Sequence, residues 1–268
     1  MAFNELNTIE PYIIKKLTGY TIPKDSGVSV VREEQEIYGD YPWKYIHPKL
    51  LKRTQTDILV ETEVIEALKR LNPEINDNPS RADEVLYKLR AVLLSVDSIG
   101  LVKANEEFAK WLCGEKTMPF GRNNQHIPIN LIDFEDIKNN SYIVTNQYTV
   151  LGKTEKRPDL VFLINGIPIV IGELKTPVRP AISWFDGAVD IHDDYENTIP
   201  QLFVPSLFSF ATEGKFYRYG SVRMPLELWG PWKTEDSKKK HTELKEIDIA
   251  IEDQLKPERL LDLLKHFT

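Results

Sequence analysis

One stretch, RPDLVFLINGIPIVIGELKTP from Arg157 to Pro177, constrains the fold of this chain more than any other. Two runs of apolar, strand-forming residues flank Asn165-Gly166, and both of these residues tolerate the positive φ that closes a tight hairpin. The runs are apolar at almost every position and do not alternate with polar residues. Both strands are therefore expected to be buried on two faces, in the middle of a covered sheet.

Three ionisable residues stand at the open end of this hairpin: Asp159 before the first strand, and Glu173 and Lys175 at the end of the second. Glu173 and Lys175 are two residues apart, so on a strand they point to the same face. A two-residue loop would place Asp159 opposite Gly172, whereas a three-residue loop would place it opposite Glu173. Because Pro168 lacks an N–H for a regular ladder, the sequence predicts a bulge or an odd-length connection that brings Asp159 and Glu173 to one side.

These three residues suggest a chemistry. Burying a lone charge costs several kcal/mol, so each group needs a partner, a metal or a catalytic role. Two carboxylates beside a lysine suit a hard divalent cation, which would activate a water and neutralise charge on a phosphate under attack. Lys175 would orient that water or stabilise the pentavalent phosphate. The pattern Pro158-Asp159 … Glu173-Leu174-Lys175 is that of PD-(D/E)xK nucleases; the same residue types also form ordinary ion pairs on surface hairpins, but here the strands are buried.

Further sequence blocks accompany the hairpin in a fixed order along the chain. They are IEPYIIKKLTGY (Ile9 to Tyr20), ALKRLNP (Ala67 to Pro73), LVKANEEF (Leu101 to Phe108), INLIDF (Ile129 to Phe134), NQYTV (Asn146 to Val150) and IPQLF (Ile199 to Phe203). With these blocks, most of the chain resembles the N-terminal region of the restriction (R, or HsdR) subunit of type I restriction-modification enzymes. The resemblance implies an α/β fold with a PD-(D/E)xK restriction-endonuclease-like core, in which helices flank a mixed central sheet, and a flanking or inserted helical layer.

The expected domain organisation follows from this resemblance and from the helical patterns. Residues 1–250 would form the endonuclease domain, with the helical layer at about 54–114 and the catalytic core at about 118–230. Residues 251–268 would form a linker helix toward a motor domain absent from this chain, since a leucine-rich last helix implies a missing neighbour. The chain has no G-x-x-x-x-G-K-[ST] phosphate loop, so ATP would be used only by that motor.

The resemblance also implies the residues of the site. Asp159, Glu173 and Lys175 would be catalytic, and Asp159, Glu173 and the backbone carbonyl of Leu174 would bind Mg²⁺, for which Mn²⁺ could substitute. Glu10, on a helix expected from Phe3 to Leu17, is a further candidate ligand. An alternative reading makes Glu10 an exposed first-turn glutamate that the helix dipole favours.

Two more residues are candidate accessory groups. Gln147 alternates with apolar neighbours on a predicted strand, so it either faces the site or pairs with backbone. Many type I nucleases carry a Gln-x-x-x-Tyr motif after the hairpin, and Tyr195 matches its tyrosine. The position four before Tyr195 is Ile191, and the polar Asp190 is one step out of register. Only Tyr195 is therefore assigned from this motif.

Composition limits the possible partners. Lys plus Arg number 34 and Asp plus Glu number 41, so the net charge is −7, whereas a domain that grips DNA alone is usually basic. Either a local basic patch or other domains and subunits would hold the DNA. The resemblance implies double-stranded DNA, methyltransferase (M) and specificity (S) subunits, and the motor domain of the same polypeptide as partners. The single cysteine fits a reducing cytoplasm, and no apolar run reaches the length of a membrane span.

The function expected from this resemblance is that of a type I site-specific deoxyribonuclease fragment. It would hydrolyse phosphodiester bonds of double-stranded DNA in a metal-dependent reaction, after ATP-driven translocation by the motor. Two alternatives remain: a PD-(D/E)xK nuclease attached to another helicase or repair protein, and a non-cleaving docking module for the methyltransferase subunits.

Overall fold

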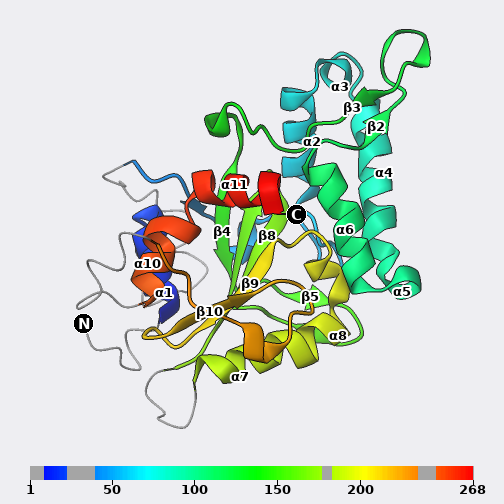
Figure 1. Cartoon of the computed structure of the whole chain (residues 1–268). Helices are drawn as coiled ribbons and strands as arrows, with labels where there is room; N and C mark the ends of the chain where they lie inside the picture. Colours follow the sequence, from blue (N-terminus) through cyan, green and yellow to red (C-terminus); the bar gives the residue numbers. More distant parts are fainter. Residues whose placement is uncertain (1–8, 23–39, 177–182, 235–245, 268) are drawn as a thin grey trace.

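A six-stranded mixed sheet forms the centre of the computed structural model, which describes residues 9–22, 40–176, 183–234 and 246–267 (Figure 1). In sheet order the strands are β1 (Lys44–Tyr45), β4 (Tyr142–Asn146), β7 (Leu160–Ile164), β8 (Ile167–Leu174), β9 (Phe208–Thr212) and β10 (Tyr217–Gly220). The pairs β1/β4 and β8/β9 are parallel and the other pairs are antiparallel. This arrangement confirms the predicted mixed sheet with flanking helices.

The predicted hairpin is β7–β8, at the centre of the sheet. Asn165 and Gly166 form its turn with φ of 51° and 80°. The register then shifts between the pairs Leu163↔Pro168 and Phe162↔Val170. Ile169 is the extra residue, so the next pairs bring Asp159 level with Glu173. The predicted bulge is confirmed. It changes the partner of Asp159 from Gly172, which a two-residue loop alone would give, to Glu173.

Helices cover both faces of this sheet, which explains why every residue of β7 is buried. On one face lie α1 (Ile9–Thr18), α10 (Glu246–Ile249) and the π-helical η8 (Ala250–Gln254). On this side Trp43 packs edge-on against Phe162, with ring centroids 5.1 Å apart, and its indole N–H donates to the Leu255 carbonyl. On the opposite face lie α7 (Trp184–Val189), the π-helical η5 (Asp190–Tyr195) and α8 (Glu196–Thr198).

A group of helices to one side of the sheet, here called the helical lobe, covers the turn end of the hairpin (Figure 1). It consists of α2 (Glu61–Leu71), α3 (Pro73–Asp77), α4 (Ser80–Leu94), α5 (Val96–Ile99) and α6 (Leu101–Leu112). The Val60 N–H, at the start of α2, donates to the Gly166 carbonyl at 2.9 Å. A Cβ on Gly166 would lie 2.6 Å from the Val60 carbonyl oxygen, so only glycine fits there. The helices lie within the stretch predicted to be helical, and the domain boundaries stay a prediction.

The remaining elements are short, apart from the last helix. They are β2 (Thr117–Met118) paired with β3 (Ile127–Pro128), β5 (Val150–Leu151) paired with β6 (Glu155–Lys156), the 3₁₀ helices Pro48–Leu50, Arg122–Asn124, Ile137–Asn139, Pro200–Phe203 and Leu226–Leu228, and α11 (Pro257–Phe267). Leu260, Leu261 and Leu264 of α11 are buried within this chain. These leucines therefore do not require a missing neighbour, and the linker role of residues 251–268 stays a prediction. Among the described residues, none of the helices combines the length and apolarity needed to cross a bilayer.

The hairpin turn is held by the side chain of Asn165, which is 1% exposed. Its Oδ1 accepts from the Ser141 N–H at 2.8 Å and from Arg70 at 3.0 Å. Its Nδ2 donates to the Leu131 carbonyl at 2.9 Å and to Asn140 at 2.8 Å. One amide therefore satisfies groups from three segments while its own backbone adopts the left-handed conformation that asparagine tolerates better than most residues.

We expect Asn165→Ala to lower the free energy of unfolding by about 3 kcal/mol or more. The substitution removes four hydrogen bonds from a buried amide and places alanine at a positive φ. Urea denaturation would measure the loss. Asn123→Ala is the matched control, because Asn123 has φ of 53° but is exposed, so it should lose only about 1 kcal/mol. Equal losses in the two variants would contradict the role given to the buried amide.

Candidate active site

The candidate site lies at the open end of the β7–β8 hairpin, opposite the turn under the helical lobe. Asp159 precedes β7 and is partly buried. Its Oδ2 accepts from the Leu174 N–H at 2.7 Å, and its Oδ1 accepts from Gln147 Nε2 at 3.0 Å. The first of these bonds fixes the carboxylate against the end of β8, beside Glu173.

Glu173 and Lys175 lie on the face of the sheet that α7 and η5 cover. Lys175 Nζ donates to Glu173 Oε1 at 3.0 Å and forms a short ion pair with Asp190. The Tyr195 hydroxyl donates to the other Glu173 oxygen at 3.3 Å. Glu173 is 6% exposed, so both of its carboxylate oxygens are engaged in a nearly closed environment.

A second row of hydrogen bonds connects Asp159 to α1. Gln147 Nε2 donates to Glu10 Oε2 at 2.8 Å as well as to Asp159, and Asn146 Nδ2 donates to Glu10 Oε1 at 2.7 Å. An ionised carboxylate can only accept hydrogen bonds, and the Gln147 NH₂ has two N–H donors, so it can bond to both Glu10 and Asp159. Tyr45 in turn donates to Asn146 Oδ1 at 2.8 Å.

Gln147 has an unusual backbone. Its φ is 49°, in the left-handed region that costs most residues about 1 kcal/mol or more. The strand β4 ends at Asn146, yet the Gln147 N–H still donates to the Asp159 carbonyl at 2.9 Å. The left-handed turn therefore keeps the chain beside Asp159 while it aims the amide side chain at two carboxylates. Strained backbone of this kind tends to occur at functional sites.

The electrostatics of the site follow from burial and from crowding of like charges. Burial raises the pKa of Glu173 to about 7, and the charge of Asp159 adds to this rise. Burial also raises the pKa of Asp159, although the hydrogen bond from the Leu174 N–H opposes the rise. Burial lowers the pKa of Lys175, but its bonds to Asp190 and Glu173 outweigh that effect, so the net pKa of Lys175 is raised. The lysine is therefore cationic at neutral pH.

Two glycines allow the elements around the site to pack closely. A Cβ on Gly172 would lie 2.4 Å from Phe210 Cζ, because the phenyl ring lies over this position. A Cβ on Gly187 would lie 3.2 Å from Ala211 Cβ and 3.4 Å from Glu173 Cγ, so α7 lies directly over the strand ends. At Gly187 the missing side chain leaves room for α7 beside Glu173.

The structure brings together the residues that the sequence singled out. Asp159, Glu173 and Lys175 meet at the hairpin end, and Tyr195 reaches Glu173. The Gln147 side chain faces the site and donates to Asp159, so the other interpretation, in which it pairs with backbone, is not what the structure shows. Glu10, a first-turn residue of α1, is joined to the site through Gln147. The catalytic and ligand roles of these residues stay predictions.

Sequence reasoning missed two members of the site. Asn146 holds Glu10, and its only signal was its position beside Gln147 at the end of a predicted strand. Asp190 pairs with Lys175, although it had been set aside as out of register with Tyr195. The four-residue spacing of the Gln-x-x-x-Tyr motif excludes Asp190, which lies five residues before Tyr195.

The donor set suits a small divalent cation. Asp159, Glu173 and the Leu174 carbonyl are hard oxygen donors, and Mg²⁺ in proteins is commonly bound by one or two carboxylates with several waters. Burial and the charge of Asp159 raise the pKa of Glu173, and burial raises the pKa of Asp159, so a bound cation would stabilise both ionised carboxylates. Within the described residues, no group of three or more His, Cys, Asp or Glu side chains is arranged to hold a metal ion.

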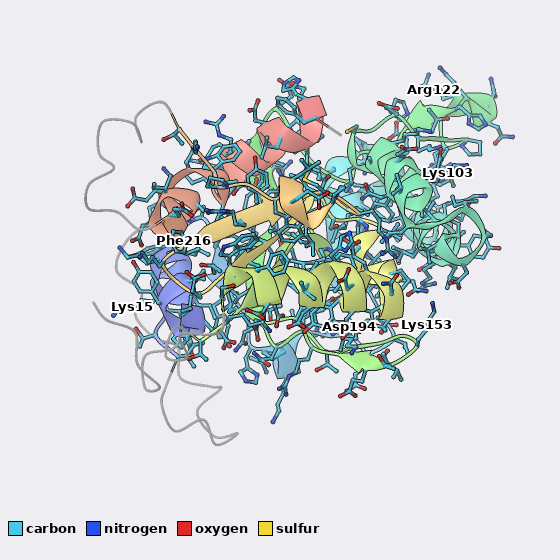
Figure 2. The ribbon with its side chains drawn as sticks, turned by 60° about the horizontal axis from the view of Figure 1, so that its bottom comes forward. Lys15, Lys103, Arg122, Lys153, Asp194 and Phe216 are labelled. Atoms are coloured by element: carbon cyan, nitrogen blue, oxygen red, sulfur yellow. The ribbon has the colours of Figure 1, made fainter. Side chains whose placement is uncertain are left out.

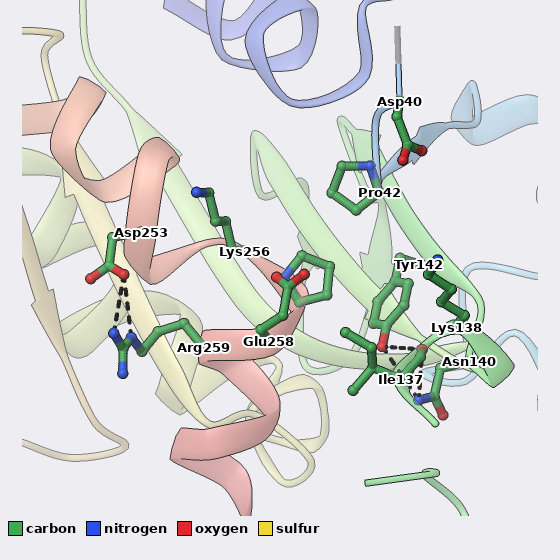
Figure 3. Close-up of a pocket in the computed structure, with 11 residues that line it drawn as sticks. Asp40, Pro42, Ile137, Lys138, Asn140, Tyr142, Asp253, Lys256, Glu258 and Arg259 are labelled. Carbon is green, nitrogen blue, oxygen red and sulfur yellow. Dashed lines mark hydrogen bonds and ion pairs between the residues drawn. The ribbon is translucent and has the colours of Figure 1, made fainter. Parts of the chain in front are cut away.

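A cavity of about 830 Å³ lies elsewhere, between the start of β4 and the start of α11 (Figure 3). Two of its charged lining residues are paired with each other, since Arg259 contacts Asp253 at 3.2 Å. The Tyr142 hydroxyl donates to the Ile137 carbonyl at 2.7 Å. None of the predicted site residues lines this cavity. Chemistry rather than volume therefore identifies the hairpin end as the candidate site.

Four labelled cationic residues in Figure 2 lie on different elements around the edge of the molecule. They are Lys15 on α1, Lys103 on α6, Arg122 on a 3₁₀ helix and Lys153 in the β5–β6 turn. In this view Lys15 lies at the left of the ribbon, and the other three lie toward its right.

Comparison with known proteins gives a consistent result. The family described as the type I restriction enzyme R protein N terminus matches residues 2–227. The chain is 27% identical over 227 residues to the type I restriction enzyme HindI endonuclease subunit of Haemophilus influenzae, covering 82% of this chain and 21% of that protein. It is 26% identical over 239 residues to the putative type I restriction enzyme MjaIXP endonuclease subunit of Methanocaldococcus jannaschii, covering 81% and 22%. The chain thus spans about a fifth of the length of these relatives.

We expect Gly172→Ala to destabilise the protein by about 1–3 kcal/mol, because the new methyl group would collide with the Phe210 ring. Urea denaturation of the variant measures the loss. Gly230→Ala is the control, since the nearest atom to a Cβ there is 4.0 Å away. If the collision is the cause, adding Phe210→Leu should cost less in the Gly172→Ala background than in the wild type. Strictly additive losses would contradict this explanation.

Proposed function

Because the chain belongs to the family of type I restriction enzyme R protein N termini, we propose that it is the DNA-cleaving part of such an enzyme. It hydrolyses phosphodiester bonds of double-stranded DNA with the help of a divalent metal ion. The observation that carries this proposal is the convergence of Asp159, Glu173 and Lys175 at the bulged hairpin. The names of the relatives, which are endonuclease subunits, support it.

The metal would be held by Asp159, Glu173 and the Leu174 carbonyl, with Mg²⁺ as the natural ion and Mn²⁺ as a substitute. When bound, the ion supplies Lewis-acid chemistry, which makes water a better nucleophile and neutralises charge on the phosphate. Asp159 is held in place for this role by the Leu174 N–H and by Gln147. Gln147 lies between Glu10 and Asp159, so Glu10 supports Gln147 and is joined to Asp159 through it.

Lys175 contributes a fixed positive charge beside the carboxylates. Two of its three N–H donors are directed at Glu173 and Asp190, which leaves one for a water or a phosphate oxygen. In the reaction the water oxygen forms a bond to phosphorus, and the bond from phosphorus to one bridging oxygen breaks. Lys175 orients the water or stabilises the added negative charge.

The rest of the system lies outside this chain. We assign DNA recognition and most DNA binding to specificity and methyltransferase subunits, and translocation to an ATP-driven motor of the same polypeptide. The acidic net charge of −7 supports a domain to which DNA is delivered rather than one that captures DNA alone.

We expect Lys175→Ala and Asp159→Asn each to lower the rate of DNA cleavage by about 100-fold or more, the usual effect of removing a group that stabilises the transition state. The measurement is plasmid cleavage by the full R subunit assembled with its partner subunits, with ATP and Mg²⁺. Translocation should proceed at the wild-type rate, because the motor is separate. The control is Lys156→Ala, a lysine that pairs with Asp194 instead. Cleavage that survives Lys175→Ala with normal translocation would refute the assignment and favour a docking module.

We expect the affinity for Mn²⁺ or Mg²⁺ to rise with pH by about tenfold per unit up to pH 7 and to level off above it. Burial and Asp159 raise the pKa of Glu173 to about 7 in the metal-free protein, so metal binding must release a proton below that pH. Calorimetry of the chain at pH 5.5 to 8.5 gives both the affinity and the proton count. Glu173→Gln should lose both the affinity and its dependence on pH. An affinity that is flat across pH 7 would exclude Glu173 as the titrating ligand.

A further inference from the structure

The helix over the candidate site changes its geometry where it passes Lys175. The segment Asp190–Tyr195 is π-helical, and the N–H of Glu196 reaches the carbonyl of Ile191, five residues earlier. In an α-helix, residues five apart point roughly 140° away from each other. A π turn contains more residues, so positions i and i+5 lie on the same side.

The side chains follow this geometry. Asp190 and Tyr195, five residues apart, both face the end of β8, where Asp190 pairs with Lys175 and Tyr195 donates to Glu173. Ile191, four before Tyr195, is fully buried in the core. The π turn therefore selects Asp190, not residue 191, to accompany Tyr195 at the site.

We infer that Asp190 is a positioning residue for the cleavage reaction, which the π-helical turn presents to the ammonium group of Lys175. This inference rests on the proposed function. Asp190 and Glu173 together hold the lysine nitrogen from two sides, so that its remaining N–H has a defined place. Asp190 acts through Lys175 and does not itself contact the metal or the DNA phosphate.

The exposure of the three side chains agrees with this division of roles. Counting side-chain atoms alone, the exposed fraction is 8% for Glu173, 20% for Lys175 and 42% for Asp190. Asp190 thus holds the lysine from the solvent side, whereas Glu173 holds it from the interior. The next carboxylates along the same turn have other partners, Asp193 with His192 and Asp194 with Lys156. Asp194→Asn is therefore a control with the same change of charge on the same turn.

The first test measures Lys175 itself and needs no nuclease activity. The full chain is acetylated with acetic anhydride at pH 9, and the rate of modification of Lys175 is followed by mass spectrometry of its peptide. In Asp190→Asn the rate should rise about tenfold, because the lysine nitrogen is no longer held from the solvent side. Asp194→Asn should leave the rate unchanged, and Asp190→Glu should restore most of the protection. An unchanged rate in Asp190→Asn would overturn the inference.

The second test uses the assembled enzyme. Asp190→Asn should lower the cleavage rate about tenfold while the affinity for Mn²⁺ measured by calorimetry stays at the wild-type value. In the Lys175→Ala background the same change should have no further effect, because Asp190 acts through the lysine. A tenfold loss of Mn²⁺ affinity without a change in the acetylation rate of Lys175 would make Asp190 a metal-binding group and overturn the inference. A wild-type enzyme that does not cleave would instead refute the proposed function, and the acetylation experiment would still decide the role of Asp190.

Discussion

A single extra residue in β8, Ile169, decides the chemistry of the hairpin end. Side chains alternate along a strand, so a shift of one residue moves every following side chain to the other face. Without the bulge, Asp159 would lie level with Gly172, and Glu173 would face away from it. Pro168 stands immediately before the bulge, where a missing N–H does least harm to the ladder. The candidate site therefore depends on an irregularity within the most buried part of the sheet.

The polar groups at the two ends of the hairpin are in opposite environments. At the turn end, the buried Asn165 amide makes four hydrogen bonds, and the helical lobe covers it. At the open end, two carboxylates are crowded together and their charges are only partly balanced by Lys175. Buried polar groups that are fully paired give rigidity, whereas crowded like charges are costly. The rigid turn end thus supports an open end where like charges are crowded.

Much of this arrangement could be predicted from the sequence because it is local. The strands, the Asn165-Gly166 turn and the bulge follow from residue types within the hairpin itself. The hydrogen bond between Glu10 and Gln147 could not be predicted, because periodicity places Glu10 on a helix but does not say which strand that helix covers. Asp190 was missed for a different reason. In an α-helix, side chains five residues apart lie on roughly opposite sides of the helix. No residue type in 190–195 signals the π turn that brings Asp190 and Tyr195 to one side. The burial of the α11 leucines inside this chain was also a tertiary outcome that the helix pattern could not give.

The hydrogen bond between Gln147 and Glu10 joins residues 137 positions apart, whereas the bond between Asp159 and Leu174 joins residues only 15 apart. Contacts between distant residues require closure of a long loop and so carry a larger entropic cost during folding. The hairpin closes over a short loop, but the support for Asp159 from α1 requires the long intervening chain to close. A chain in which α1 is undocked would therefore hold the acidic pair without its full set of supports.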